Sequence, residues 1–347
     1  MMQVKTVIVG VGNVGRRLLE LVERKKVLLR ERFGLELVVV AVADSSGARM
    51  LGQSAELHEL IGQKAQGKKI AEIQAGMSGA PAVSAHELLQ TIDADLLVEL
   101  SPTNLQTGEP GLSLIRTALG RKMNVVTANK GPMVLAFQEL TALAEQQGSR
   151  LLYSATVTGG LPTLNIGRRD LGACEFTGFE GVVNATTNYI LTTMLEGGSY
   201  EAALKHAQEV GHAEADPSLD VDGWDAANKL VIIANAVLRQ PTRLQDVEVE
   251  GIRGVTPEQL QDAREHGEVI KLLARAERIY GGEGDYRLSV KPTRLPQQHA
   301  LARIGAEMMG IVYHTDINGT ILSLIEERDP YPTAAAVLRD MVNASVA

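Results

Sequence analysis

The stretch KTVIVGVGNVG, residues 5–15, decides the fold of the N-terminal half of the chain. Its first five residues are a β-branched run typical of a buried strand, and a helical pattern over residues 16–32 follows the glycines. Gly10, Gly12 and Gly15 have the G-x-G-x-x-G spacing, which allows a tight turn, close approach to a pyrophosphate and close helix–strand packing. The helix N-terminus offers free N–H groups to the phosphates. The stretch predicts a dinucleotide site, with a purely structural turn as the alternative.

Strands and helices continue to alternate after this stretch. The pattern predicts strands at residues 36–42, 95–100 and 124–127, and helices at residues 85–91, 108–121 and 133–147. Residues 64–84 are rich in glycine, alanine and small polar side chains, which indicates a loop with one short helix. Strands separated by such helices form βαβ units around a parallel sheet. Residues 1–150 are therefore predicted to form a Rossmann-type, doubly wound α/β domain.

The second half of the chain has a different pattern. It predicts strands at residues 150–156, 178–184, 287–293, 305–314 and 320–326, and helices at residues 185–196, 224–238 and 332–342. A hairpin turn at residues 317–319 indicates a mixed or antiparallel sheet. We therefore expect an α+β domain over residues 151–319. Residues 320–347, with the last helix, are expected to return to the dinucleotide-binding domain.

The composition restricts the class of protein. The 347 residues are 45% apolar and 22% charged, which is ordinary for a soluble globular protein. The formal net charge of −8 argues against nucleic acid as a partner, because its phosphates need a basic surface. Cys174 is the only cysteine, so a disulfide framework and a cysteine-rich metal site are excluded. The apolar runs are too short to cross a membrane and no signal-peptide pattern opens the chain, so we expect a cytoplasmic enzyme or binding protein.

An acidic residue, Asp44, ends the second predicted strand. An acid at this position accepts hydrogen bonds from the adenosine ribose and repels a 2′-phosphate, so Asp44 favours NAD over NADP. The alternative is an aspartate that only initiates the turn D-S-S-G. Arg49, Lys64 and Lys68 follow it in the sequence, and a fold that returns them to this strand end would favour a 2′-phosphate.

Polar residues also follow the next two predicted strands. Residues 99–103 (ELSPT), which include Ser101 and Thr103, come after one strand, and Lys130 follows the other within T-A-N-K-G. Open α/β sheets bind ligands at the carboxyl ends of their strands. Lys130 is therefore either an ordinary solvated lysine or a residue with a catalytic or substrate-binding role.

The densest cluster of charged residues is GHAEADPSLDVDGWDAANK, residues 211–229. Asp225 and Lys229 lie four residues apart on one predicted helix, so their side chains share a face. A surface ion pair would contribute only about 0.3–0.5 kcal/mol. The helix continues into an apolar run, however, which favours a partly buried lysine able to donate a proton. A divalent-cation site is the other alternative, but the spacing does not match an EF-hand loop.

These segments together resemble homoserine dehydrogenase. The similarity covers most of the chain and is carried by residues 10–15, 99–103, 127–130, 155–162, 184–191 and 211–229. The last segment fills every fixed position of the pattern G-x-A-E-x-D-P-x-x-D-x-x-G-x-D-A-x-x-K. The resemblance implies interconversion of L-aspartate 4-semialdehyde and L-homoserine with NAD or NADP, in threonine and methionine biosynthesis. It also implies that residues 151–319 form the catalytic and oligomerisation domain.

The resemblance assigns roles by position. Lys229 corresponds to the catalytic lysine, which Asp225 orients, and Lys130 corresponds to a lysine between cofactor and substrate. Glu214 and Asp225 correspond to carboxylates that hold the substrate's amino group and hydroxyl end, with Asp220 as a further carboxylate. The other substrate-binding positions are Gly211 and Asn184, and the cofactor-binding positions are Gly10, Gly12, Asn13, Val14, Gly15, Asp44, Ser101, Thr103 and Lys130.

The chain departs from the family pattern in several places. Several members bind a monovalent cation such as Na⁺ beside the A-T-V turn. In this chain the carbonyls of Val157, Gly159 and Leu161 correspond to that site, but Ser154 stands where a glutamate is common. Residues 326–332 (EERDPYP) replace a glycine-rich segment. The chain lacks the C-terminal regulatory ACT domain of some members, so we expect little feedback inhibition by threonine.

Two other interpretations and the assembly remain open at this point. The chain is alternatively a dehydrogenase of similar layout for another amino acid, or a non-catalytic NAD-sensing regulator. The second alternative predicts no reactive cluster in the second half, and residues 211–229 argue against it. The family forms dimers and larger assemblies, so the middle sheet and its hairpin strands are expected to pair in a homodimer or a dimer of dimers.

Overall fold

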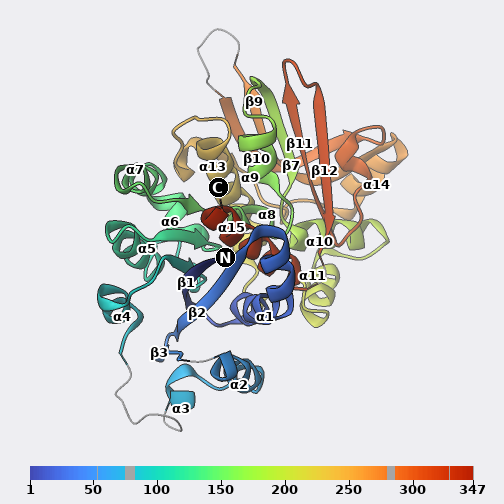
Figure 1. The fold of residues 1–347 in the computed structure, drawn as a ribbon. Coiled ribbons are helices and arrows are strands. Elements are labelled where there is room, and N and C mark those ends of the chain that lie inside the picture. Colours follow the sequence, from blue (N-terminus) through green and yellow to red (C-terminus); the bar gives the residue numbers. More distant parts are fainter. Residues whose placement is uncertain (53, 75–82, 280–285, 328, 347) are drawn as a thin grey trace. The chain divides into compact units, whose positions relative to one another are not determined.

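The structure, a computed structural model, describes residues 1–52, 54–74, 83–279, 286–327 and 329–346 (Figure 1). The chain packs into two compact units, of which the first comprises Met1–Gly160 and Asp329–Ala347 and the second comprises Leu161–Arg328. The units divide at these positions, rather than after residue 150 and before residue 320. Residues 320–326 stay with the second unit because they form a strand that pairs with residues 308–314.

The sheet of the first unit has the strand order β3-β2-β1-β4-β5-β6. Its strands are β1 (Met2–Val9), β2 (Leu35–Asp44), β3 (Gly47–Met50), β4 (Leu96–Glu99), β5 (Asn124–Thr127) and β6 (Leu151–Leu152). All neighbours are parallel except β3, which is antiparallel to β2. The order runs outward from β1 in both directions, so the carboxyl ends of β1 and β4 form the switch point at which such sheets bind ligands.

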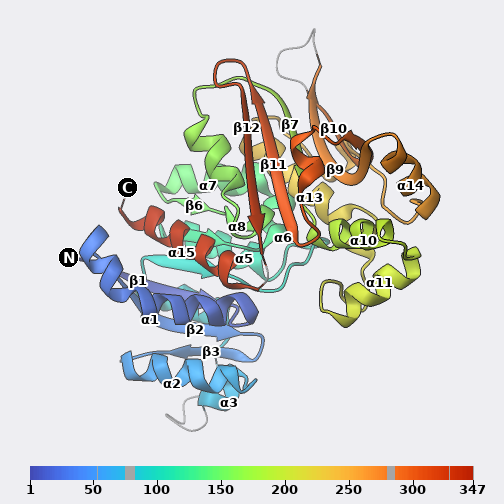
Figure 2. The ribbon, with the colours of Figure 1, turned by 90° about the vertical axis from the view of Figure 1, so that its right-hand side faces the viewer.

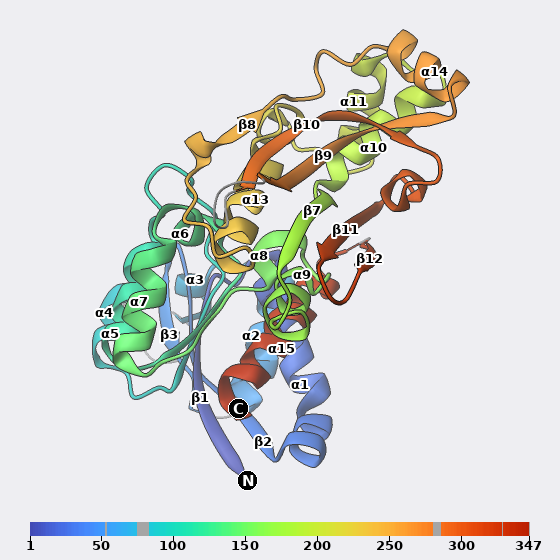
Figure 3. The same ribbon diagram turned by 90° about the horizontal axis from the view of Figure 1, so that it is seen from above.

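Helices cover both faces of this sheet. They are α1 (Asn13–Phe33), α2 (Ser54–Ala65), α3 (Ile70–Gln74), α4 (Ala85–Thr91), α5 (Gly111–Gly120), α6 (Lys130–Leu135), α7 (Phe137–Gln147), α8 (Ala155–Thr158) and α15 (Tyr331–Val346). The last helix, α15, lies alongside α1 (Figure 2) and buries Val337 and Met341 in the same apolar core. Helices α5 and α7 lie on the opposite side of the strands (Figure 3).

The second unit contains a mixed sheet with the order β12-β11-β7-β9-β10-β8. Its strands are β7 (Phe176–Val182), β8 (Val247–Val249), β9 (Glu268–Arg278), β10 (Tyr286–Pro296), β11 (Met308–Thr315) and β12 (Thr320–Glu326). Only β8 and β10 are parallel neighbours. The hairpin between β11 and β12 closes through Thr315, whose N–H donates to the Gly319 carbonyl oxygen at 3.0 Å. The predicted α/β class, with a doubly wound domain and a second domain built on a mixed sheet, is confirmed.

The second unit also contains helices. They are α9 (Thr163–Asn165), η1 (Ile166–Asp170), α10 (Ala185–Leu195), α11 (Tyr200–Glu209), α12 (Ser218–Val221), α13 (Trp224–Ala236), η2 (Leu244–Asp246), α14 (Pro257–Glu265) and η3 (Ala300–Arg303). Helix α13 contacts β8, β9 and β10, and α10 contacts β9 and β11. Among the described residues of both units, no helix is long and apolar enough to cross a membrane.

Several predicted elements are wrong in detail. The strand expected over residues 150–156 is limited to β6, because the chain turns into α8 where the Ser154 N–H donates to the buried Asp340 carboxylate at 2.8 Å. The single helix expected over residues 133–147 is two helices that meet at Ala136. The short helix expected within residues 64–84 is α3, at residues 70–74, and residues 75–82 of that segment lie outside the described residues.

Candidate active site

The glycine-rich turn after β1 leaves the start of α1 open. Gly10 has a φ of +96°, and a Cβ at this position would lie 2.2 Å from the Leu100 carbonyl oxygen. A Cβ at Gly15 would lie 2.1 Å from the Gly10 carbonyl oxygen, so both positions require glycine. Gly12 caps α1 without a side-chain hydrogen bond, and a Cβ there would meet nothing within 4 Å. The first N–H groups of α1, which begin at Asn13, are therefore left for a phosphate group.

The residues present fit the pyrophosphate of a dinucleotide. The N-terminus of α1 carries the positive end of a dipole from a helix of 21 residues. No acidic side chain lies in its first turn, where an anion would be repelled. Asn13, Val14 and Gly15 form that first turn.

Asp44 lies at the carboxyl end of β2, but its carboxylate already accepts four hydrogen bonds. The donors are the N–H and hydroxyl of Ser46, the Nζ of Lys64 at 2.9 Å and the N–H of Ile70 at 3.0 Å. Burial opposes the charged form, but the hydrogen bonds from Lys64 and Ser46 outweigh it and lower the pKa of Asp44. The contacts with Ser46 are those of an aspartate that initiates a turn. Asp44 also forms an ion pair with Lys64, so the fold returns this lysine to the end of β2.

The ends of β4 and β5 are joined by a buried polar network around Glu99. Its Oε1 accepts hydrogen bonds from the N–H of Ser101, at 2.8 Å, and from the Ser101 hydroxyl. Its Oε2 accepts from the Thr127 hydroxyl at 2.9 Å, and Asn129 Nδ2 donates to the Ser101 hydroxyl at 3.3 Å. Burial raises the pKa of Glu99, whereas these hydrogen bonds oppose the rise. The network fixes Ser101 at the switch point of the sheet.

Lys130 begins α6, directly after the helix cap Asn129. The Asn129 side chain accepts a hydrogen bond from the Gly131 N–H at 3.0 Å, which sets the direction of the helix. Lys130 is half-buried, and Thr103 is exposed on the loop after β4. Because Thr103 follows the end of β4 and Lys130 follows the end of β5, both lie beyond the carboxyl ends of these strands.

In the second unit, α13 presents Asp225 and Lys229 on one face. The Lys229 Nζ lies 2.8 Å from the Asp225 carboxylate and donates to the Val183 carbonyl oxygen at 2.6 Å. The two side chains are only 12% and 10% exposed, so the interpretation as a solvated surface ion pair is wrong. Because an ammonium carries three donors, one N–H of Lys229 remains for another acceptor.

Asn184 connects this pair to a second carboxylate. Its Nδ2 donates to Asp225 at 2.8 Å and to Asp220 at 2.6 Å. Its Oδ1 accepts from the N–H of Thr187 at 2.8 Å, so the same side chain caps α10. Burial raises the pKa of Asp220, and the negative charge of Asp225 raises it further. Two carboxylates and one ammonium therefore meet in a largely desolvated cluster.

The other acidic residues of segment 211–229 do not join this cluster. Asp222 pairs with Arg253, and Asp216 accepts a hydrogen bond from the Ser218 N–H at 3.1 Å. Glu214 is exposed, and within the described ranges its carboxylate has no hydrogen bond. Gly211, with a φ of +83°, forms the turn after α11. Of the acidic residues in this segment, Asp220 and Asp225 are therefore the two that meet near Lys229.

The three residues expected to bind a cation lie in consecutive turns. Val157 is in α8, Gly159 follows with a φ of +54°, and the Leu161 carbonyl oxygen accepts the Thr163 N–H at 2.8 Å. Where the family has a glutamate, the hydroxyl of Ser154 donates to the buried carboxylate of Asp340. No pattern in the sequence pointed to Asp340, which lies 186 positions from Ser154. Among the residues that the structure describes, no group of histidine, cysteine and acidic side chains is arranged to hold a metal ion.

The comparisons with known proteins agree with this arrangement. The family model for the homoserine dehydrogenase NAD-binding domain matches residues 10–154, and the homoserine dehydrogenase family model matches residues 162–342. The chain belongs to the homoserine dehydrogenase family. Members of this family are NAD(P)-dependent oxidoreductases.

Individual relatives extend over the full chain. Homoserine dehydrogenase from Methanocaldococcus jannaschii is 34% identical over 338 residues, which cover 97% of each chain. NAD(+)-dependent homoserine dehydrogenase from Pseudomonas canavaninivorans is 31% identical, over 99% of this chain and 96% of that one. The crystal structure of a putative homoserine dehydrogenase from Archaeoglobus fulgidus is 39% identical, with a TM-score of 0.87 over 99% of this chain and all of that chain.

Proposed function

We propose that this chain interconverts L-aspartate 4-semialdehyde and L-homoserine, with NAD or NADP as the cofactor. The observation that carries the proposal is the buried cluster of Asp220, Asp225 and Lys229 in the unit that matches the homoserine dehydrogenase family model. The first unit supplies an open helix N-terminus for the cofactor's pyrophosphate. The pathway is threonine and methionine biosynthesis, and the location is the cytoplasm.

The cluster suits an amino acid with an oxygen at its far end. Asp220 and Asp225 hold the substrate's ammonium group, whose charge compensates two carboxylates that repel each other. Glu214 is a further carboxylate available to this group or to the hydroxyl end. Asn184 keeps Asp220 and Asp225 in place by donating to both, and Gly211 shapes the adjoining turn.

Lys229 is the proposed acid–base residue. The nicotinamide ring supplies or accepts the hydride when the cofactor is bound. Negative charge then develops on the aldehyde oxygen, and the third N–H of Lys229 stabilises that oxygen and delivers a proton to it. Asp225 and the Val183 carbonyl oxygen hold Nζ in one orientation, so little reorganisation accompanies the transfer. Lys130, in the first unit, is the second cation proposed to contact substrate and cofactor.

The proposed cofactor contacts lie at the carboxyl ends of the strands of the first unit. Gly10, Gly12, Asn13, Val14 and Gly15 bind the pyrophosphate in this proposal. The nicotinamide ribose contacts Ser101 and Thr103, and the adenosine ribose lies at Asp44. The carbonyls of Val157, Gly159 and Leu161 bind a monovalent cation such as Na⁺.

The assembly is proposed to be a homodimer or a dimer of dimers. Strand β12 lies at the edge of the second sheet and exposes Leu322 and Leu324, which are 43% and 41% exposed. An unprotected edge strand with apolar side chains is suited to pairing with a second copy of the chain.

The activity is tested by following absorbance at 340 nm with purified protein, L-homoserine and either NAD or NADP. We expect reduction of at least one cofactor, and oxidation of the reduced cofactor with aspartate semialdehyde. No signal with either cofactor, together with activity toward a different amino acid, would refute the proposed substrate. No signal with any amino acid would refute an enzymatic function.

A further inference from the structure

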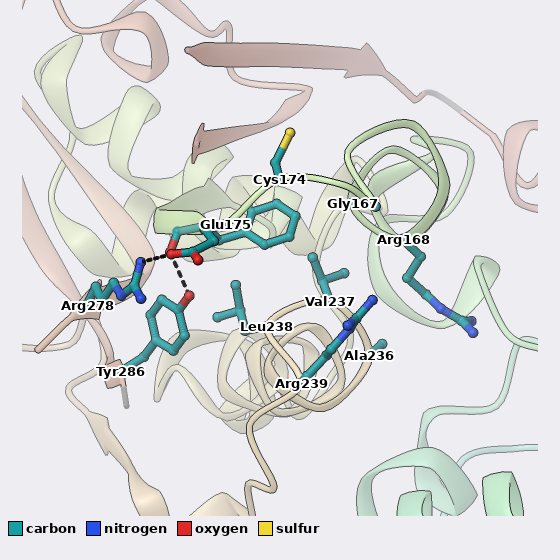
Figure 4. A pocket seen from close by; sticks show the side chains of 12 residues that line it. Gly167, Arg168, Cys174, Glu175, Ala236, Val237, Leu238, Arg239, Arg278 and Tyr286 are labelled. Carbon is teal, nitrogen blue, oxygen red and sulfur yellow. Dashed lines mark hydrogen bonds and ion pairs between the residues drawn. The ribbon is translucent and has the colours of Figure 1, made fainter. Parts of the chain in front are cut away.

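A cavity of about 390 Å³ lies in the second unit, away from the Asp225–Lys229 cluster. Its walls are η1, the segment that leads into β7, the end of α13 and the adjoining ends of β9 and β10 (Figure 4). None of its lining residues belongs to the proposed catalytic cluster. The volume is within the range of small-molecule sites.

The charged lining of this cavity is predominantly positive. It contains Arg168, Arg239 and Arg278, against a single acidic residue, Glu175, which gives a net charge of +2 (three minus one). Glu175 is already paired with Arg278 at 3.0 Å. Arg239, in contrast, makes no hydrogen bond or ion pair with any of the residues that the structure describes, and its guanidinium extends from the end of α13 toward η1 (Figure 4).

Arg239 lies in the turn that ends α13. Arg239 has a φ of +57°, in the left-handed region where glycine or asparagine is normally found after a helix. The Gln240 N–H donates to the Ala234 carbonyl oxygen at 3.1 Å, so the end of α13 closes around this residue. A glycine would relieve the strain of this left-handed backbone.

The wall that faces Arg239 is rigid. Gly167 in η1 approaches α13 so closely that a Cβ would lie 2.5 Å from a methyl carbon of Val237 and 3.1 Å from the Tyr313 hydroxyl oxygen. This contact fixes η1, which carries Arg168, against the end of α13, which carries Arg239. η1 is a π-helix, an irregularity that often occurs at functional sites. The two backbone segments that carry the arginines are thus packed against each other, and both arginine side chains are exposed.

We propose that this cavity binds a small organic anion, with a carboxylate or phosphate group on Arg239 and Arg168. Guanidinium groups bind the oxygens of both anions in pairs, which makes arginine suited to either. Val237, Leu238 and Phe176 form apolar lining on which a short carbon chain packs. The site is separate from the proposed catalytic function and does not depend on it.

Cys174 provides a direct readout, because it lines the cavity and is the only cysteine of the chain. Alkylation by iodoacetamide, followed as intact mass, therefore reports on this cavity alone. The probes are inorganic phosphate and succinate, each compared with potassium chloride at equal ionic strength. We expect one of the probes to slow alkylation about tenfold at ten times its Kd. The more effective probe identifies the preferred anionic group.

Two variants separate specific binding from a change in the fold. Arg239→Gly removes the guanidinium and relieves the left-handed backbone, so it is expected to keep its Tm and lose the protection of Cys174. Lys122→Gly is the matched control, because Lys122 also has a left-handed backbone, with a φ of +62°, but lies in the first unit. It is expected to keep the protection. Equal alkylation in all three salts, or equal protection in Arg239→Gly, would overturn the proposal.

Discussion

The Lys229 ammonium lies 2.8 Å from the Asp225 carboxylate, one turn away on α13, and both side chains are largely buried. Withdrawing such a pair from water costs more free energy than the attraction between the two charges returns, unless further hydrogen bonds complete the geometry. Here the Val183 carbonyl oxygen and the Asn184 amide supply those bonds. The arrangement leaves one N–H of Lys229 for a substrate oxygen, which is the property that the proposed reaction uses.

Replacement of Lys229 by alanine is the first test of that property. Loss of a positioned proton donor typically lowers a rate by about 10²–10⁴-fold, so we expect kcat of Lys229→Ala to fall within that range. Cofactor binding, measured by fluorescence titration, should not change, because the pyrophosphate loop is in the other unit. Lys205→Ala is the control, since Lys205 is 78% exposed on α11. Near-normal turnover of Lys229→Ala would remove Lys229 from the mechanism.

Asn184 has two functions that different substitutions separate. A serine also caps helices, so Asn184→Ser is expected to retain stability, whereas Asn184→Ala should lose about 1 kcal/mol of unfolding free energy. Neither variant can donate to Asp220 and Asp225 together, so both should raise KM for homoserine. Urea unfolding and steady-state kinetics of the two variants test this separation. A serine variant with normal KM would show that Asn184 is only a helix cap.

The pairing of Asp225 with Lys229 was predictable because it is local. A spacing of four residues on a helix places two side chains together whatever the rest of the fold. The contacts of Asn184 with Asp225 and of Ser154 with Asp340 join residues 41 and 186 positions apart. No periodicity or composition encodes such distances, and for Asn184 only the family resemblance indicated a role.

The sequence pattern does not predict strand β9, for a related reason. It carries Lys271 and Arg275 four residues apart within apolar sequence, which gives no clear alternation. Lys271 is nevertheless buried, because its ammonium donates to the Asn188 side-chain oxygen at 2.6 Å and to the Ile304 carbonyl oxygen at 3.2 Å. Those partners come from other elements, so the tertiary structure overrides the local pattern. Strands β1 and β5 were found because they are short, apolar and bounded by turn residues.

The hydrogen bond between Lys64 and Asp44 predicts how the cofactor preference responds to mutation. Lys64 neutralises Asp44 and donates to its Oδ2 atom, which also accepts the Ile70 N–H. In Lys64→Ala the carboxylate is no longer neutralised, so it repels a 2′-phosphate, and the acceptor position that Lys64 leaves is open to the ribose 2′-hydroxyl. We expect the ratio of KM for NADP to KM for NAD to rise about tenfold, equivalent to about 1.4 kcal/mol. Lys68→Ala, at an exposed lysine that contacts Gln63, should leave the ratio unchanged. An unchanged ratio in Lys64→Ala would place the ribose elsewhere.

Glu99 makes stability depend on pH. Burial raises its pKa above the ordinary value of 4.5, so the folded protein binds this proton more tightly than the unfolded chain does. From pH 4.5 up to the raised pKa, unfolding free energy should fall relative to a variant without the carboxyl, by at most about 1.4 kcal/mol per pH unit. Urea unfolding of the wild type and Glu99→Gln at pH 5 and pH 8 measures the difference.

The control for that prediction is Glu87→Gln. The hydrogen bonds from Ser84 lower the pKa of Glu87, whose carboxylate is therefore charged in both folded and unfolded chains above pH 5. Its contribution is lost only as the pH falls toward the lowered pKa, so the difference from wild type should be the same at pH 5 and pH 8. Parallel pH profiles for the wild type and Glu99→Gln would contradict the assignment of a raised pKa to Glu99.

If the exposed leucines of β12 form the interface between copies of the chain, a substitution there should disrupt the assembly. Leu324 lies on the edge strand, where a lysine opposes pairing by charge and by its hydration. We expect the mass of the wild type, measured by light scattering after gel filtration, to be a multiple of the chain mass of 37.2 kDa, and that of Leu324→Lys to be 37.2 kDa. Val27→Lys, at a valine 64% exposed on α1, should keep the wild-type mass. A monomeric wild type, or an assembled Leu324→Lys, would show that β12 is not the interface. Because Leu324 lies outside the Asp225–Lys229 cluster, activity that survives in the monomer would show that each chain carries a complete site.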